Sequence, residues 1–299
     1  MQLSVIIVNW NTCELLDRCL NTLSIELKAL NLFDSGSEVY VIDNNSADGS
    51  QTAVAKNHPW VKLISNEDNL GYARANNQAL QLASGKHVLL LNPDTEIYSG
   101  AIGSLISFLD DHLRAGIVAP QLINTDGSIQ SSCRTFPSFT ALLYELVGLS
   151  RIMPAGSRAR SYKMLDWGHD DERQVDQPEG ACLLIRKELF SQIGLFDEGF
   201  FMLFEEVDWC YRAKQAGWEI WFTPKAKVLH HLGQAIKQVK IKMILSSHRG
   251  LYRYWYKHHR HSRKYLDAIV YGALMSLAYL RIVSYSIRRS ILQLGAIHT

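Results

Sequence analysis

Three carboxylates stand close together in the second half of the chain, at Glu205, Glu206 and Asp208. They follow the apolar run 200–204 and open a segment with the spacing of an amphipathic helix. Apolar surroundings and neighbouring like charges both disfavour ionisation, so they raise the pKa of a carboxyl group towards values that suit a general base. Acidic residues at a helix start also complement the helix dipole, which alone explains one or two of them. We therefore expect a catalytic carboxylate here, with helix-start acidity as the alternative.

Another carboxylate, Asp94, follows an uninterrupted apolar run at 88–91, as in a strand buried on both faces of a parallel sheet. Asn92 and Pro93 end this strand, because proline cannot donate to a strand ladder. Asp94 is then expected just past the carboxyl end of the sheet, where open α/β folds bind ligands. A carboxylate there can hold a divalent cation, which in turn can hold a diphosphate. An isolated Asn-Pro-Asp is otherwise a common turn.

His230 is a candidate second ligand of that cation. It follows the apolar pair 228–229, and a neutral imidazole binds manganese more readily than magnesium. A histidine beside an apolar run is more often structural or exposed.

The elements that must position these residues alternate between short apolar runs and amphipathic segments. Strands are expected at 3–8, 38–42, 61–64, 88–91, 117–119, 179–186 and 218–222, and helices at 14–27, 73–83 and 101–113. This alternation predicts an α/β fold with a mostly parallel sheet flanked by helices. The segment 124–176 has little periodicity beyond a hairpin turn at 126–130, and so long an irregular run inside a compact domain is usually functional or mobile.

Polar loops follow the first strands. Asp43 ends the second strand, but the first turn, 9–12, lacks the glycines of a dinucleotide-binding fold, which excludes nicotinamide binding. Asp43 is therefore a candidate acceptor for the base or ribose of a mononucleotide, with a helix cap as the alternative. Asn69 and Gly71 form a tight loop before a helix start that could bind an anion with Arg74, although Arg74 could equally be solvated.

Four motifs together carry a family resemblance: 4–11, 41–46, Asn69-Leu70-Gly71 with Asn76, and 90–94. They resemble the family 2 glycosyltransferases of GT-A fold, and in particular rhamnosyltransferase-like members. The resemblance covers about residues 3 to 236 and implies an inverting, metal-dependent enzyme that uses a nucleotide-diphosphate sugar. A non-catalytic nucleotide-sugar-binding or assembly protein that keeps the fold is the alternative.

The resemblance also implies roles for individual residues. Asp94 matches the last position of the family's metal-binding motif, which holds Mn²⁺ or Mg²⁺, and His230 with Gly233 matches a motif whose histidine joins the metal or the diphosphate. Phe204 to Asp208 matches the motif of the catalytic base, which falls on Glu206, with Glu205 and Asp208 as alternatives. The expected donor-binding residues are Val8, Trp10, Asn11, Asp43, Asn69, Gly71, Arg74, Asn76, Asn92, Gly180 and Ala181.

Composition indicates one large domain with an appendage. The chain has 299 residues, of which 47% are hydrophobic and 20% are charged. We divide the chain into a catalytic domain at 1–240 and an extension at 241–299. Five cysteines form no C-x-x-C pair, and the first residues lack the pattern of a secretory signal. Both features predict reduced thiols and a cytoplasmic location.

The extension mixes aromatic and basic residues at 249–264 and then has an uncharged apolar stretch at 268–280. Thirteen uncharged residues are short for a membrane span, so we expect reversible attachment to the inner face of the membrane, next to a lipid-linked glycan acceptor. This pattern favours lipid over nucleic acid. The alternative is a helical hairpin packed on the catalytic domain or in a homodimer.

Overall fold

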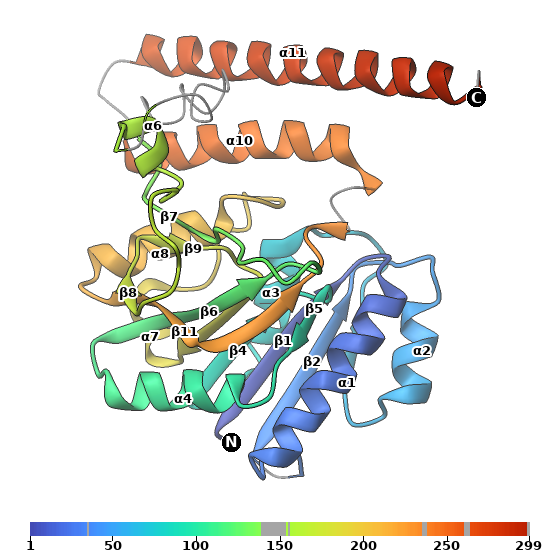
Figure 1. The fold of residues 1–299 in the computed structure, drawn as a ribbon, viewed down its shortest axis with the longest axis vertical. Helices are drawn as coiled ribbons and strands as arrows, with labels where there is room; N and C mark the ends of the chain where they lie inside the picture. The colour runs from blue at the N-terminus through green and yellow to red at the C-terminus, as the bar shows by residue number, and fades with distance from the viewer. Residues whose placement is uncertain (35, 139–153, 155, 235–237, 260–263, 298–299) are drawn as a thin grey trace.

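The computed structural model describes residues 1–34, 36–138, 154, 156–234, 238–259 and 264–297. A central sheet with helices on both faces confirms the predicted α/β class (Figure 1). The strands are β1 (Leu3–Asn9), β2 (Ser37–Asp43), β3 (Lys62–Ser65), β4 (His87–Leu91), β5 (Thr95–Ile97), β6 (Ala115–Ile123), β7 (Cys133–Arg134), β8 (Arg173–Gln174), β9 (Gln177–Pro178), β10 (Cys182–Arg186) and β11 (Glu219–His230). The helices are α1 (Cys13–Ala29), α2 (Ser50–Asn57), α3 (Tyr72–Leu80), α4 (Ala101–Asp111), α6 (Arg158–Ser161), α7 (Glu188–Ile193), α8 (Glu205–Gln215), α10 (Lys240–His258) and α11 (Lys264–Ile297).

The main sheet has the strand order β3-β2-β1-β4-β10-β6-β11-β5, with β8 paired to β11. The first four strands are parallel, but β10 runs antiparallel to both β4 and β6, so the sheet is mixed. The predicted strand at 179–186 begins only at Cys182, which pairs with Leu91 at the end of β4. Because β10 is reversed, the residues before it lie at the edge where β1, β2, β4 and β11 end.

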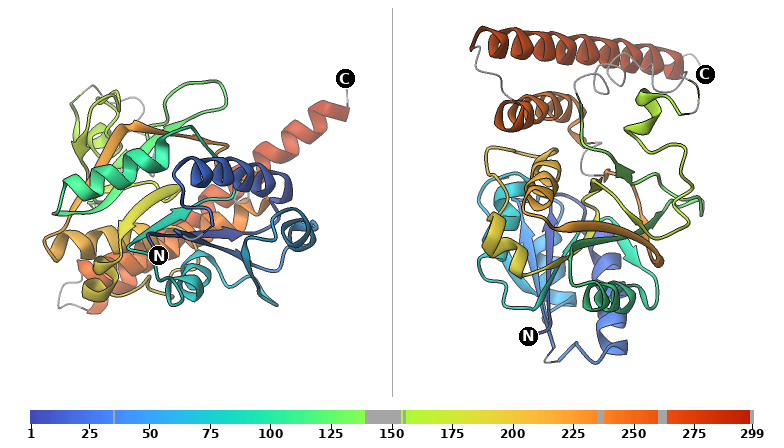
Figure 2. Two further views of the ribbon diagram at one scale, coloured as in Figure 1. Left: turned by 90° about the horizontal axis from the view of Figure 1, so that it is seen from below. Right: turned by 90° about the vertical axis from the view of Figure 1, so that its left-hand side faces the viewer.

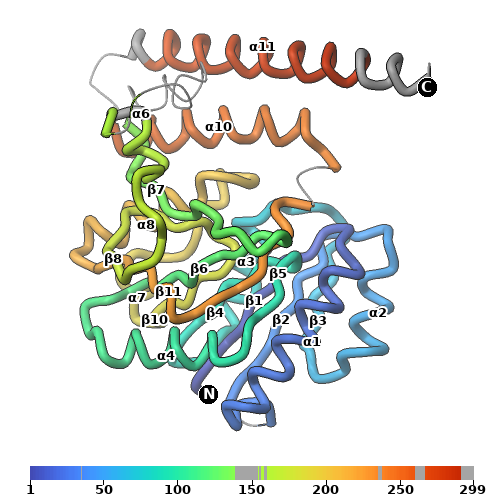
Figure 3. Tube along the Cα trace, viewed as in Figure 1, coloured from blue at the N-terminus to red at the C-terminus, as the bar shows by residue number. Residues whose placement is uncertain are grey.

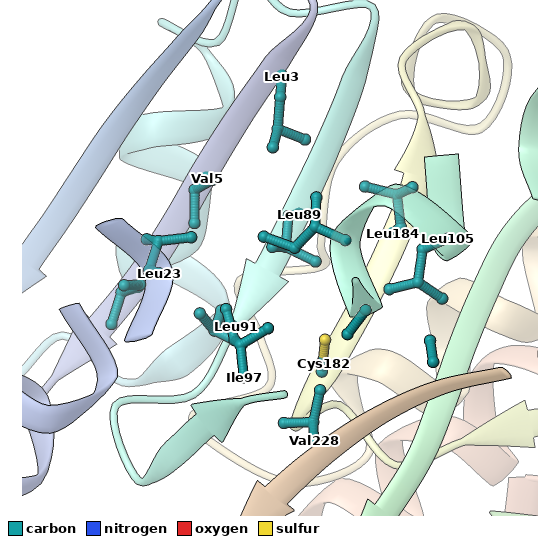
Figure 4. Close-up of a cluster of buried hydrophobic side chains, with 14 of the residues drawn as sticks. Leu3, Val5, Leu23, Leu89, Leu91, Ile97, Leu105, Cys182, Leu184 and Val228 are labelled. Carbon is teal, nitrogen blue, oxygen red and sulfur yellow. The ribbon is translucent and has the colours of Figure 1, made fainter. Parts of the chain in front are cut away.

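The core lies on both faces of this sheet, because residues alternate along each strand. Val5 and Ile7 of β1 join a cluster with α1 and α4, whereas Ile6 and Val8 join a cluster with α3, α7 and α8. Figure 4 shows the first cluster, where Leu23 and Leu105 approach the strands from two helices. All five cysteines are free, as predicted.

The carboxyl-terminal helices stack above one end of the domain, with α11 lying along α10 on the outer side (Figures 1 and 3). Tyr252 of α10 meets Tyr271 of α11 edge to face, with ring centroids 4.9 Å apart. Figure 2 shows that α11 extends beyond the domain. The chain therefore ends in the helical extension that the sequence predicts.

The apolar segment of α11 is longer than the thirteen-residue stretch at 268–280. Arg281 interrupts the uncharged run but not the helix, since arginine is a good helix former. Within the described residues, one stretch, Asp267–Ser290, is long and apolar enough to cross a membrane by length and composition. The uncharged stretch at 268–280 is therefore part of a longer segment with the length and composition of a membrane span.

Candidate active site

A cleft opens at the sheet edge where the parallel strands end. Its lining residues come from the end of β1 and the loops after β1, β2, β3, β4 and β11, from the loop between α7 and α8, and from the starts of α3 and α10. They are Val8, Trp10, Thr12, Asn44, Asn69, Gly71, Tyr72, Asn92, Pro93, Asp94, Phe201, Met202, Gly233, Val239, Lys242 and Met243. Five of the expected donor-binding residues, Val8, Trp10, Asn69, Gly71 and Asn92, lie together here with Asp94. Ligand sites in open α/β sheets occupy this edge.

Gly71 shapes one wall of the cleft. Its N–H donates to Asn69 Oδ1 at 3.0 Å, and its φ of +84° with ψ of 174° lies in a region that only glycine occupies readily. A Cβ at Gly71 would lie 2.2 Å from the carbonyl oxygen of Phe201, which accepts the N–H of Tyr72 at 2.7 Å. The glycine therefore lets the loop before α3 join the loop before α8.

Asp94 and His230 come together because β5 and β11 pair with Thr95 opposite His230. His230 Nε2 lies 3.4 Å from Asp94 Oδ1, and both side chains are buried. Burial lowers the pKa of His230, but the contact with Asp94 outweighs it and the net shift is upward. Burial raises the pKa of Asp94, but the contact with His230 holds it below its usual value.

Gln130 orients His230 from the other side. Its Nε2 donates to the carbonyl oxygen of His230 at 2.8 Å, and its Oε1 lies 3.1 Å from His230 Nδ1. An Nδ1–H that donates to Gln130 leaves the lone pair on Nε2, the atom that faces Asp94. Nε2 is buried and has no hydrogen-bond partner among the described residues. Gln130 lies in the predicted hairpin turn, and sequence reasoning gave it no role.

Asp94 and His230 together suit a divalent cation that also binds a substrate diphosphate. A buried imidazole nitrogen without a hydrogen-bond partner among the described residues lies 3.4 Å from a carboxylate oxygen. The described residues contain no cluster of three His, Cys, Asp or Glu side chains that would form a complete protein site. Mg²⁺ and similar cations commonly use one or two carboxylates, with substrate phosphates and water as the other ligands.

Glu205 and Glu206 begin α8, directly after two residues with a left-handed backbone, Leu203 (φ 72°) and Phe204 (φ 76°). Burial raises the pKa of both carboxyl groups, and the charge of Glu206 raises that of Glu205 further. In each, Oε2 is buried without a hydrogen-bond partner in the described part of the chain. Glu205 is 4% exposed whereas Glu206 is partly exposed, so Glu206 is the more accessible.

Asp208 has a different environment from the other two acids. It is fully buried and contacts Arg212 at 2.9 Å, Lys257 at 2.8 Å and His258 at 2.6 Å. Burial raises its pKa, but the hydrogen bonds from His258 and Lys257 hold the pKa below its usual value. These contacts fasten α10 to α8 and leave Asp208 poorly suited to accept a proton.

Tyr72 links the acidic pair to the cleft, and sequence reasoning missed it. Its hydroxyl donates to the carbonyl oxygen of Gly180 at 3.3 Å, and Gly180 lies beside Glu206. Burial, followed by the charges of Glu205 and Glu206, raises the pKa of this hydroxyl. Its position directly after Gly71 was the one available sequence signal.

Several expected donor-binding residues lie outside the cleft lining. Asp43 accepts hydrogen bonds from Asn9, Ser46 and Gln51, so it organises the loop after β2. The predicted alternative as a helix cap is not observed, because α2 begins after Gly49 without a side-chain cap. Asn11 accepts the N–H of Ala47 at 2.7 Å and supports the same loop.

Arg74 does not face the cleft: its Nε lies 3.2 Å from Glu198, and both side chains are substantially exposed. Asn76 donates to the carbonyl oxygen of Tyr72 within α3. The carbonyl oxygen of Ala181 accepts the N–H of Asn92 at 2.8 Å, which ties the start of β10 to the end of β4. Arg74, Asn76 and Ala181 are not part of the cleft lining.

The model of the family described as Glycosyl transferase family 2 matches residues 4–212. The chain belongs to glycosyl transferase family 2. This membership confirms the resemblance seen in the sequence motifs and establishes that the protein is an enzyme.

Relatives of this family 2 glycosyltransferase include several named for sugar transfer. An N-acetylglucosaminyl-diphospho-decaprenol L-rhamnosyltransferase of Mycobacterium tuberculosis is 30% identical, and the alignment covers 96% of this chain and 95% of the relative. A dTDP-rhamnosyl transferase of Shigella flexneri is 26% identical over 74% of this chain and 67% of its own.

Solved structures support the GT-A fold of this glycosyltransferase. Staphylococcus aureus TarS in complex with UDP matches with a TM-score of 0.53 and 16% identity, over 92% of this chain and 71% of that chain. A structure of GalNAc-T7 with UDP, GalNAc and Mn²⁺ matches with a TM-score of 0.56 and 17% identity, over 77% of this chain and 44% of that chain. At these identities the likeness shows the fold alone.

Proposed function

We propose that this glycosyltransferase moves rhamnose from dTDP-rhamnose to a hydroxyl of a lipid-linked glycan, with inversion at the anomeric carbon. The observation that carries the proposal is the arrangement around Tyr72. On one side lie Asp94 and His230, which suit a cation and a diphosphate, and on the other lie Glu205 and Glu206 with raised pKa values. Tyr72 thus joins a leaving-group site in the cleft to a base that lies beside the cleft lining.

Glu206 is the proposed base. Its carboxylate accepts the proton of the acceptor hydroxyl while the acceptor oxygen attacks the anomeric carbon from the face opposite the diphosphate. The bond between that carbon and the diphosphate oxygen breaks, and the diphosphate leaves with the bonding electrons. When bound by Asp94 and His230, Mn²⁺ or Mg²⁺ would offset the charge on the departing diphosphate. Burial, followed by the charge of Glu179, keeps the pKa of Glu206 high.

The names of the relatives support the choice of donor and acceptor. The Shigella relative is named a dTDP-rhamnosyl transferase, and the mycobacterial relative is named for an acceptor that joins a sugar to a polyprenol through a diphosphate. The mycobacterial alignment covers nearly the whole of both chains. A role in cell-surface polysaccharide biosynthesis follows from such an acceptor.

A donor panel tests the proposal without knowledge of the acceptor. Purified full-length protein with Mn²⁺ should slowly hydrolyse dTDP-rhamnose and release dTDP, measured by chromatography, in preference to UDP-glucose, UDP-N-acetylglucosamine and GDP-mannose. Release of dTDP that persists in Glu206→Gln at the full rate would point to a contaminating hydrolase. Consumption of another donor instead would overturn the choice of rhamnose.

The helical extension suggests that the enzyme binds its acceptor at a membrane surface. The outer helix α11 exposes apolar side chains near basic ones, a composition that suits the headgroup region of an anionic membrane. The exposed apolar residues are Ile269, Tyr271, Tyr279, Leu280, Val283 and Ile287, and the basic ones are Arg281, Arg288 and Arg289. We propose that α11 lies on the inner face of the cell membrane and presents the cytoplasmic active site to its lipid-linked acceptor.

Part of the basic segment at 249–264 has a different role from the one expected. Arg253 and Lys257 pair with Asp197, and Lys257 and His258 pair with Asp208, so these three residues face the catalytic domain. The positions 260–263 lie outside the described residues. The boundary at 240 separates two kinds of sequence. In the structure, α10 packs on the catalytic domain and contributes Met243 and Tyr254 to its buried interior.

Binding to lipid vesicles tests the role of α11. Full-length protein should sediment with anionic vesicles at low salt and less so as salt rises, because the electrostatic part is screened within a Debye length of about 8 Å at physiological salt. The double variant Leu280→Glu with Ile287→Glu should lose most of this binding, since it places charge on the apolar surface. Leu113→Glu, at an exposed leucine of the catalytic domain, is the matched control. Unchanged sedimentation of the double variant, or its conversion from dimer to monomer, would favour the homodimer instead.

A further inference from the structure

Lys242, in the first turn of α10, is a cation with no role in the site described so far. It lines the same cleft as Asp94 and Asn92, and its ammonium lies 4.3 Å from the centre of the Phe201 ring. No described residue forms an ion pair with it. Its charge is therefore held at the cleft without an acidic partner.

The position of Lys242 is unfavourable within its own helix. The amino-terminal end of a helix carries partial positive charge, so basic residues in the first turn are destabilising there. The first turn of α10 contains Lys240 and Lys242 and no acidic residue. The basic residues Arg253, Lys257 and His258 at the other end of α10 all pair with carboxylates. An anion bound in the cleft would offset the positive charge of these lysines and of the helix end, and so make their position favourable.

The charges of the cleft leave room for one more cation. A nucleotide-diphosphate sugar carries two negative charges on its diphosphate, and Asp94 adds a third. A divalent cation balances two of these three, and one negative charge then remains. The ammonium of Lys242 balances it. We propose that Lys242 binds the diphosphate of the sugar donor and stays with it as the bond to the sugar breaks.

This inference rests on the proposed function and adds a donor-binding residue from the segment that the sequence assigns to the extension. It makes α10 part of the donor site as well as the base of the hairpin. Because Asp208 and Asp197 fasten the far end of α10, they also fix the position of Lys242 at the cleft. A contact that shifts the helical hairpin of α10 and α11 would therefore also shift Lys242 in the donor site.

Calorimetric binding of nucleotides in the presence of Mn²⁺ tests the inference. Full-length wild-type protein should bind dTDP more tightly than dTMP, since only dTDP has a second phosphate. Lys242→Met keeps the length of the side chain and its packing on Phe201, and it should weaken dTDP binding about tenfold while leaving dTMP binding nearly unchanged. Lys242→Arg should restore most of the affinity for dTDP. Lys240→Met removes the neighbouring exposed charge and should change neither affinity.

The outcomes separate this inference from the proposed function. If wild-type protein binds dTDP and Lys242→Met binds it equally well, the role of Lys242 is wrong and the proposed function stands. Equal weakening of dTDP and dTMP binding, or weakening by Lys240→Met as well, would show a general electrostatic or folding effect and overturn the specific contact. If wild-type protein binds neither dTDP nor UDP, GDP or ADP, the proposed function and the inference fall together.

Discussion

Replacing Asp94 by asparagine should lower sugar transfer by roughly a thousandfold, because it removes the carboxylate that we assign to a cation beside the leaving diphosphate. Asparagine keeps an oxygen that can accept the N–H of Gln234, which Asp94 Oδ2 now accepts at 3.2 Å, so the fold should persist. Initial rates with dTDP-rhamnose, and Mn²⁺ binding followed by electron paramagnetic resonance with dTDP present, measure the effect.

Glu96→Gln is the matched control for Asp94→Asn. Glu96 lies two residues further along, on β5, and pairs with His231 at 2.8 Å outside the cleft lining. A partly exposed pair of this kind contributes little, so transfer and Mn²⁺ binding should stay within about twofold of wild type. Full activity of Asp94→Asn in the presence of a chelator would end the assignment of Asp94 to a cation.

Replacing Glu206 by glutamine should lower transfer by about a hundredfold to ten-thousandfold, the range that general-base catalysis contributes. The binding of dTDP with Mn²⁺ should be unchanged, because Glu206 is absent from the lining of the donor cleft. Measured kcat should therefore fall while the affinity for dTDP stays constant. A Glu206→Gln enzyme with near-normal kcat would move the base to Glu205 or to another group.

The pH dependence of transfer should report the same carboxyl pair. Glu206 acts only when deprotonated, and its pKa is raised by burial, so kcat should fall as the pH is lowered through that raised pKa. The charge of Glu179 adds to this upward shift, so Glu179→Gln should lower the pKa of Glu206 and move the fall in activity to lower pH, with most activity retained at neutral pH. The folded state favours the protonated carboxyl groups, so the stability they contribute is present at low pH and lost as the pH rises through their pKa.

Local pattern was sufficient to predict much of the fold and of the cleft. Apolar runs of four or more residues marked β1, β2 and β4, and the turn residues after them marked the edge where ligands bind. Asp94 was assigned correctly to that edge because a proline ends its strand. Glu205 and Glu206 were recognised as a helix start with raised pKa values, because neighbouring aromatic residues and like charges are visible in the sequence.

The features that were missed depend on contacts between distant segments. The reversed direction of β10 places Gly180 beside Glu206, and nothing local to 179–186 encodes strand direction. His230 was expected after the last strand, but β11 continues to it through pairing with β5 and β6. Asp208 cannot be told from its acidic neighbours in the sequence. In the structure, Lys257 and His258 of α10 pair with it, so Asp208 holds α10 against α8. Lys242 could not be assigned because its helix reaches the cleft from the far end of the chain.

Nuclear magnetic resonance of the complete reaction tests the central claim most directly. Wild-type protein would be mixed with dTDP-rhamnose, Mn²⁺ and a short-chain polyprenyl-diphosphate-N-acetylglucosamine, and the anomeric signals of donor and product would be followed over time. A single base at Glu206 and a diphosphate leaving from the opposite face predict a product of inverted anomeric configuration, formed with cation and lost with chelator. A product that retains the donor configuration, or one that forms at the same rate with chelator present, would contradict this account.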